Sequence, residues 1–222
     1  MIVVAVIAIV ASIAVPNLLS SRLTTNESAA VATLRNLISA QAQFQAGTLI
    51  DTDEDGTGEY GFFGELSGAT NLRDRNGGVN GATLTLPVLS GVFRTVRNAV
   101  VNHSGYFFQM YLPDADGVGV MEASTGGANP GNMPDADHSE ITWCCYAWPA
   151  NLHTSGNRAF CVNQLGILTQ TNNEAAGQNY SGTESQPEPD AMFLDPSTSG
   201  SILGMIAVGT TGADGGRWVA VE

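Results

Sequence analysis

The first sixteen residues constrain this chain most, because they are almost entirely apolar. The sequence opens MIVVAVIAIVASIAVP, in which Ser12 is the only polar residue before Pro16. The chain then continues into ESAAVATLRNLISAQAQFQA, which is rich in residues that favour helices. We therefore predict one long helix over residues 1–47, apolar on all sides in its first part and amphipathic in its second.

The apolar part is short for a membrane span. About fifteen helical residues rise about 22 Å, whereas the hydrocarbon core of a bilayer is about 30 Å thick and needs about 20 apolar residues. A secretory signal peptide is disfavoured, since no basic residue precedes the run and no small-residue cleavage site ends it. A buried core helix remains an alternative, but the run is apolar on every face and leads directly into more helix.

The second part of the predicted helix carries an apolar stripe on one face. Its positions are spaced alternately by four and three residues, with Val31 and Ile38 at its flanks, and Gly47 supplies a stop signal. Such a stripe requires a partner surface, and we expect a β-sheet formed by the rest of the chain to provide it. The positions of the stripe are Ala30, Leu34, Leu37, Gln41 and Phe44.

The N-terminal stretch resembles a known family. MIVVAVIAIVASIAVPNLL, with Pro16 followed by Asn17, Leu18 and Leu19, is similar to the N-terminal segment of type IV pilins and of type II secretion pseudopilins. In that family a prepilin peptidase removes a short leader, the new N-terminus is methylated, and a Glu follows shortly after. Alignment on Pro16 implies about six residues before Met1, including that Glu, and these would complete a membrane span of about 20 residues.

The resemblance implies an α+β fold, in which a long N-terminal helix, kinked or melted near Pro16, packs on an antiparallel β-sheet head. A proline removes one backbone donor and its ring clashes with the preceding turn, so an interruption there is expected on physical grounds too. The implied function is a structural subunit of an extracellular type IV pilus-like filament that polymerises through its N-terminal helix. The implied filament interface comprises Met1, Ile2, Val3, Val4, Val6, Ile7, Ile9, Val10, Ile13, Val15, Pro16, Leu18 and Leu19.

The chain is thus expected to divide into a helix, residues 1–47, and a β-rich head, residues 48–222. The expected partners are other copies in a helical homopolymer, the prepilin peptidase, the pilus or secretion assembly machinery and, before assembly, the inner membrane. After assembly the chain would lie in a filament on the cell surface. Two alternatives remain open: a pseudopilin of a type II secretion system, and a membrane-tethered extracellular binding protein or enzyme.

The head is strongly acidic. Of 21 acidic and 8 basic residues in the chain, only Glu27, Arg22 and Arg35 precede residue 51, so residues 51–222 carry 20 acidic and 6 basic residues, a net charge of −14. Because nucleic-acid binding depends on basic surfaces, we expect the head to bind no nucleic acid.

One acidic segment has the spacing of a calcium loop. Asp51, Asp53 and Asp55, followed by Gly56, reproduce the start of the D-x-D-x-D-G pattern. Position 62 is Phe where an EF-hand has a bidentate Glu, so this is not an EF-hand. Two interpretations remain: a calcium site, which a main-chain carbonyl near Thr57 and the side chain of Glu59 would complete, and a solvated acidic turn. No other cofactor is expected.

Three cysteines lie in or near the clearest strand pair, residues 141–148 and 158–169. Because Cys144 and Cys145 are adjacent, their side chains point to opposite faces of a strand, and only one of them can face Cys161. We predict a disulfide between Cys161 and either Cys144 or Cys145; three reduced, buried thiols are the alternative.

The remainder of the head gives weaker signals. GEYGFFGEL, YFFQMYLPDADG and WCCYAWPANLHTSGNRAFCVNQLGILTQT are similar to a group of long pilin-like proteins from planctomycete-type bacteria, a resemblance that carries no catalytic residues. His103, His138 and His153 have no metal-ligand spacing, and the sequence contains no nucleophile-elbow, P-loop or dinucleotide-binding motif. The PDADG segment that begins at Pro113 predicts a turn, and a similar PDAD recurs from Pro134 to Asp137. We expect no enzymatic activity.

Overall fold

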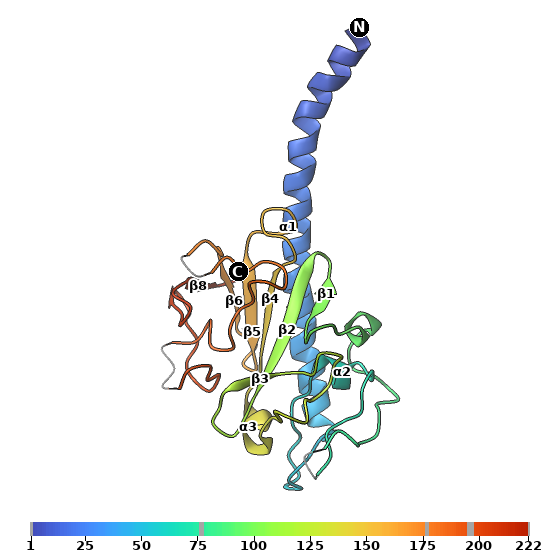
Figure 1. Ribbon diagram of the computed structural model, residues 1–222, viewed down its shortest axis with the longest axis vertical. Helices are drawn as coiled ribbons and strands as arrows, with labels where there is room; N and C mark the ends of the chain where they lie inside the picture. Colours follow the sequence, from blue (N-terminus) through green and yellow to red (C-terminus); the bar gives the residue numbers. More distant parts are fainter. Residues whose placement is uncertain (1, 76–77, 176–177, 195–197, 222) are drawn as a thin grey trace.

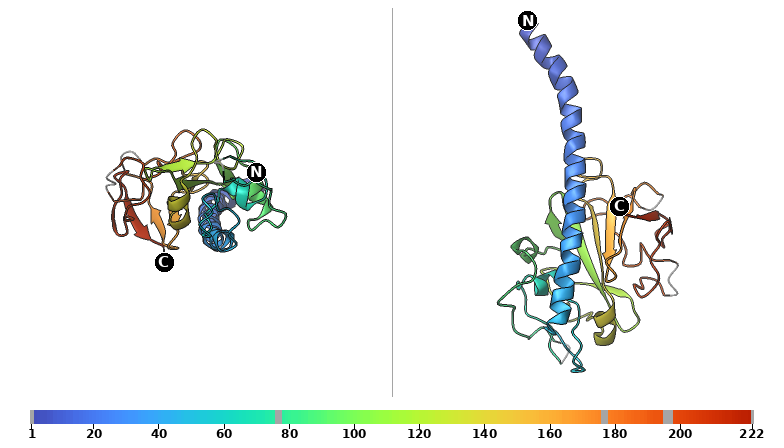
Figure 2. Two further views of the ribbon diagram at one scale, coloured as in Figure 1. Left: turned by 90° about the horizontal axis from the view of Figure 1, so that it is seen from below. Right: turned by 180° about the vertical axis from the view of Figure 1, so that it is seen from behind.

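The computed structural model of the protein describes residues 2–75, 78–175, 178–194 and 198–221. A 45-residue helix, α1 (Ile2–Ala46), extends far beyond a globular head, and its second half lies against one face of a β-sheet (Figures 1 and 2). The other helical elements of the described chain are short: α2 (Phe63–Leu66), the 3-10 helix η1 (Gly91–Arg94) and α3 (Ala136–Ile141). The chain is therefore α+β, as predicted.

The second half of α1 buries the stripe that the sequence predicts. Ala30, Leu34, Leu37, Gln41 and Phe44 are buried, and Val31 and Ile38 pack at the margin of the same core. The one polar member, Gln41, is satisfied because its amide both accepts from and donates to the backbone of Gly61, at 3.1 and 2.8 Å. The helix ends at Ala46, directly before Gly47.

Of the two interruptions predicted near Pro16, a kink or a melted turn, the melted turn is wrong, because α1 is continuous helix with Pro16 inside it. The exposed part of the helix curves away from the line of its second half (Figure 2). A proline removes a single backbone donor, and curvature relieves the clash of its ring with the preceding turn, so the surrounding hydrogen bonds are sufficient to keep the helix intact.

The sheet is antiparallel throughout, with strand order β1-β2-β4-β5-β6-β8-β7 and with β3 paired to β2. Helix α1 contacts β2, β4 and β5, the centre of the sheet. The strands are β1 (Val101–His103), β2 (Tyr106–Pro113), β3 (Gly119–Met121), β4 (Cys144–Pro149), β5 (Ala159–Asn163), β6 (Leu168–Thr171), β7 (Thr210–Thr211) and β8 (Arg217–Ala220).

Each face of the sheet has its own core. The face toward α1 contributes Phe108, Met110 and Phe160 to the cluster that contains the α1 stripe. The opposite face contributes alternate residues of the same strands, among them Tyr146 and Trp148, which pack under the C-terminal segment of the chain. This alternation is the period of two expected of strands that are buried on both faces.

The predicted disulfide is absent: Cys144, Cys145 and Cys161 are free and buried. The strand register explains why, since Cys161 lies opposite Tyr146 and Cys144 lies opposite Asn163. Cys144 and Cys161 share a face as diagonal neighbours, whose Cα atoms lie about 7–8 Å apart in antiparallel sheets, beyond the span of a disulfide. Cys145 belongs to the other face. Burial raises the pKa of the Cys145 and Cys161 thiols well above the usual value, which keeps both thiols protonated.

Candidate functional site

The apolar part of α1 lies entirely outside the head. Its large side chains are exposed, from 81% for Ile2 to 51% for Leu19, and it is long and apolar enough to cross a membrane. Among the predicted interface residues, Met1 and the side chain of Val6 lie outside the described part of the chain. The others, Ile2, Val3, Val4, Ile7, Ile9, Val10, Ile13, Val15, Pro16, Leu18 and Leu19, form a rod that projects from the head (Figure 1).

A partly buried ion pair fixes the base of this rod to the head. Glu27, in α1 just after the exposed part, accepts hydrogen bonds from Nε and Nη2 of Arg158 at 2.8 and 2.6 Å. Its second oxygen accepts from the backbone N–H groups of Asn157 and Arg158 at 3.0 and 3.3 Å. The preceding residue of α1, Asn26, donates from its side-chain amide to the carbonyl of Ser155 at 2.8 Å. The rod is therefore held to the sheet where it leaves the head.

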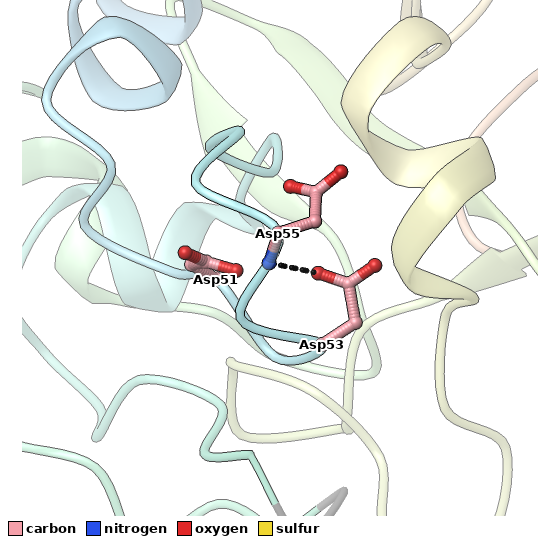
Figure 3. Close-up of side chains that lie close together, drawn as sticks. All are labelled: Asp51, Asp53 and Asp55. Carbon is pink, nitrogen blue, oxygen red and sulfur yellow. Dashed lines mark hydrogen bonds between the residues drawn. The ribbon is translucent and has the colours of Figure 1, made fainter.

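The three aspartates of the predicted calcium loop lie together. Asp51, Asp53 and Asp55 each place a carboxylate oxygen within 4.8 Å of the others (Figure 3). Turn hydrogen bonds hold them: Asp53 accepts from the backbone of Asp55 at 3.2 Å, and Asp55 accepts from that of Thr57 at 2.7 Å. One oxygen of Asp51 accepts from Gly56 at 3.2 Å, while its other oxygen is buried without a hydrogen-bond partner.

A fourth carboxylate, which the sequence did not single out, lies beside this loop. Glu140 is on α3, the helix that passes beside the loop in Figure 3, and one of its oxygens is buried without a hydrogen-bond partner. Desolvation, together with the charges of Asp55 and Asp53, raises the pKa of Glu140 to about 7. A group of carboxylates that repel one another in this way has the hard oxygen ligands that calcium prefers, and we name Asp51, Asp53, Asp55 and Glu140 the acidic loop site.

Glu59, the other predicted ligand, has different partners. One carboxylate oxygen accepts from the backbone of Thr52 at 2.8 Å, and the other pairs with Arg73 at 2.8 Å. Arg73 also pairs with the fully buried Glu65 at 3.1 Å, so two buried carboxylates share one guanidinium. Glu59 therefore stabilises the loop through Thr52 and is not among the three carboxylates that lie together. Thr57 contributes to the turn by donating its backbone N–H to Asp55.

The three histidines lie in separate surroundings. His138 is on α3 with Asp135 at 3.4 Å, His153 contacts Asn157 at 3.1 Å, and His103 contacts Ser104 at 3.4 Å. Within the described residues, none of these contacts joins a histidine to a cysteine or a second histidine, as in a metal site, or to a serine–carboxylate pair, as in a catalytic triad. No protein-family model, curated protein or solved structure matches this chain.

Proposed function

We propose that this chain is the structural subunit of an extracellular type IV pilus-like filament, which polymerises through α1 and displays its acidic head. One observation carries the proposal: a single helix is buried in the head over its second half and is exposed and apolar over its first half. A rod of this kind has no stable place in water, because each Å² of exposed apolar surface costs about 25 cal/mol.

Two environments remove this surface from water, and the proposal uses both in turn. Before assembly the rod lies in the inner membrane, where the prepilin peptidase acts on the chain. During assembly the machinery moves it into a bundle of such rods along a filament axis. If each chain contacts the next through the same pair of surfaces, and the rotation between neighbours does not close a ring, the result is a helical polymer. Because Glu27 and Arg158 fix the rod to the sheet, the position of each rod determines the position of its head.

A pilus and a secretion pseudopilus differ in their assembly machinery and not in the chemistry of their subunits. A pseudopilin of a type II secretion system is therefore the second candidate among filament subunits. A membrane-tethered binding protein or enzyme is the alternative from another class. The amphipathic half of α1 favours a filament over a tether, because a tether requires only a span and a flexible link, whereas here the span continues as the central core helix of the head. We propose no catalytic activity and no nucleic-acid binding for the head.

We propose calcium as a stabilising ligand of the acidic loop site. Asp51, Asp53 and Asp55 lie together, and the partnerless oxygens of Asp51 and Glu140 support a cation between the loop and α3. Calcium there would join the segment that follows α1 to a helix near the end of β2, and so would stiffen the end of the head farthest from the rod (Figure 1).

The experiment that tests the proposed function separates a filament from a tether. Cells that produce the chain together with a prepilin peptidase and assembly machinery are sheared, and the released fraction is examined by electron microscopy with an antibody against the head. A filament subunit appears in sheared filaments with its apolar segment intact. A tethered protein stays in the membrane fraction, and finding the chain there alone, in cells that process it, would contradict the proposal.

A further inference from the structure

A hollow of about 340 Å³ lies at the edge strand β1, on the side of the sheet away from α1. Val100 forms part of its floor and belongs to the core cluster on that side, and Phe107 packs against the same cluster. The volume falls in the range of sites for small organic ligands, about 300–1,000 Å³. The rim of the hollow is polar and consists of Thr95, Arg97, Asn98, Asn102 and Thr183.

The floor of the hollow is a firmly supported aromatic ring. Phe107 lies directly opposite Asn102 in the β1–β2 pairing, so the two side chains stand next to each other on one face. Behind Phe107, the fully buried ring of Trp148 packs at a centroid distance of 6.0 Å. Trp148 also donates from Nε1 to the carbonyl of Gly182 at 2.8 Å, which fixes the segment that carries Thr183.

The opposite wall is a tight turn held in an unfavourable conformation. Arg97 and Val100 exchange backbone hydrogen bonds at 2.9 and 3.2 Å, and the two residues between them, Asn98 and Ala99, have φ of 53° and 62°. Turns of this kind favour Asn followed by Gly, so Ala99 is strained. The turn places Arg97 and Asn98 at the rim, and the burial of Ala99 and Val100 holds it there.

The polar groups of the rim are not used within the protein. The side chains of Thr95, Arg97, Asn98, Asn102 and Thr183 make no hydrogen bond or ion pair with any part of the chain that the structure describes. No acidic residue lines the hollow, although the head as a whole carries a net charge of −14. An unpaired guanidinium in a hollow without carboxylates can bind one carboxylate of a ligand through short-range, charge-assisted hydrogen bonds.

We propose that this hollow binds a saccharide that carries a carboxylate, such as the uronic acid units of extracellular polysaccharides. The face of the Phe107 ring suits the C–H face of a pyranose, and the amides and hydroxyls of the rim suit its hydroxyl groups. The guanidinium of Arg97 receives the carboxylate through paired N–H···O bonds. The hollow lies on the side of the sheet opposite α1, so binding does not depend on the proposed filament.

The test uses the full-length chain in detergent micelles, titrated by calorimetry with tetragalacturonate, with neutral galactotetraose and with inorganic phosphate. We expect tetragalacturonate alone to bind with measurable heat. Arg97→Gln should weaken this binding at least tenfold, and Asn102→Ala should weaken it severalfold. Because neither exposed side chain makes a hydrogen bond or ion pair with the rest of the described protein, both variants should melt close to the wild-type temperature, which separates loss of binding from loss of folding.

Arg217→Gln is the matched control, because Arg217 is an exposed arginine on β8, at the other end of the sheet. It should bind tetragalacturonate as the wild type does. Three results would overturn the proposal: no binding of tetragalacturonate at millimolar concentration, equal loss of binding in the Arg97 and Arg217 variants, or equal binding of tetragalacturonate and either the neutral tetramer or phosphate.

Discussion

Arg158, directly before β5, donates two hydrogen bonds, at 2.6 and 2.8 Å, to one carboxylate oxygen of Glu27 on α1. The two residues are 131 positions apart in the sequence, and their contact lies where the exposed rod enters the head. Arg158 also stacks over Phe160 at 5.6 Å and donates to Gln170 at 2.8 Å, so the pair is continuous with the sheet. The contact therefore makes the rod and the head one unit.

Glu27→Ala should lower the free energy of unfolding of the full-length chain by about 2–3 kcal/mol, because it leaves Arg158 and two backbone N–H groups without their acceptor. The side chain of Arg158 is 39% exposed, and solvent keeps the loss below that of a fully buried pair. Denaturant unfolding in detergent measures the change. Arg35→Ala, an exposed arginine on the same helix, is the control and should change stability by less than about 0.5 kcal/mol. Equal losses in the two variants would contradict this role of Glu27.

Glu122 makes the stability of the head depend on pH. It is buried, one of its oxygens accepts from Gly64 and Gly127 at 3.2 and 3.1 Å, and its other oxygen has no partner. Desolvation raises the pKa of Glu122 to about 8. The folded chain therefore keeps a proton that the unfolded chain loses above about pH 4.5, so this contribution to stability is present at low pH and is lost as pH rises to about 8.

Glu122→Gln should remove the loss of stability at rising pH, because the amide is neutral at every pH. Its oxygen can still accept from the N–H groups of Gly64 and Gly127. We expect the difference in unfolding free energy, variant minus wild type, to grow by about 2 kcal/mol or more between pH 5 and pH 8. Chemical denaturation at a series of pH values measures it, with the exposed residue change Glu184→Gln as the control. A difference that stays constant with pH would show that Glu122 does not hold the proton.

Calcium should raise the melting temperature of the wild-type chain, and the triple change of Asp51, Asp53 and Asp55 to Asn should abolish the rise. The rise should shrink as pH falls below about 7, because the pKa of Glu140 lies near that value and a protonated carboxyl is a poor ligand. Differential scanning calorimetry with calcium and then with excess chelator measures the effect. Asp116→Asn, in a turn elsewhere in the head, is the control. An unchanged rise in the triple variant would place the calcium site elsewhere.

The sequence was informative where a regular period or a local motif carried the information. The stripe from Ala30 to Phe44 could be predicted because burial on a helix repeats every three to four residues, and the proximity of Asp51, Asp53 and Asp55 followed from their spacing. The contact of Glu27 with Arg158 and that of Phe107 with Asn102 could not be predicted, because they depend on how α1 packs on the sheet and on how the strands pair.

Two errors have identifiable causes. The disulfide prediction assumed that Cys161 faces one of the adjacent cysteines, but a register set by the whole hairpin places Tyr146 opposite it. The second PDAD segment, for which no helix was predicted, begins α3: Asp135 is the N-cap and accepts from the backbone of His138 at 3.1 Å. An Asp before a short polar helix is a recognisable cap, so the start of α3 could have been predicted, although the position of Glu140 beside the loop depends on tertiary packing.

The most direct test of the central claim compares one substitution at two exposed apolar positions. Ile13, on the rod, is 65% exposed, and Leu86, on the head, is 84% exposed. Leu86→Arg should leave the yield of sheared filaments unchanged, whereas Ile13→Arg should reduce it at least tenfold, because the charge would lie inside the bundle of rods. Both chains should still be recovered from the membrane fraction, since one arginine costs about 2.5–3.5 kcal/mol in a span that is otherwise apolar. Filaments in equal amounts from both variants would contradict the account.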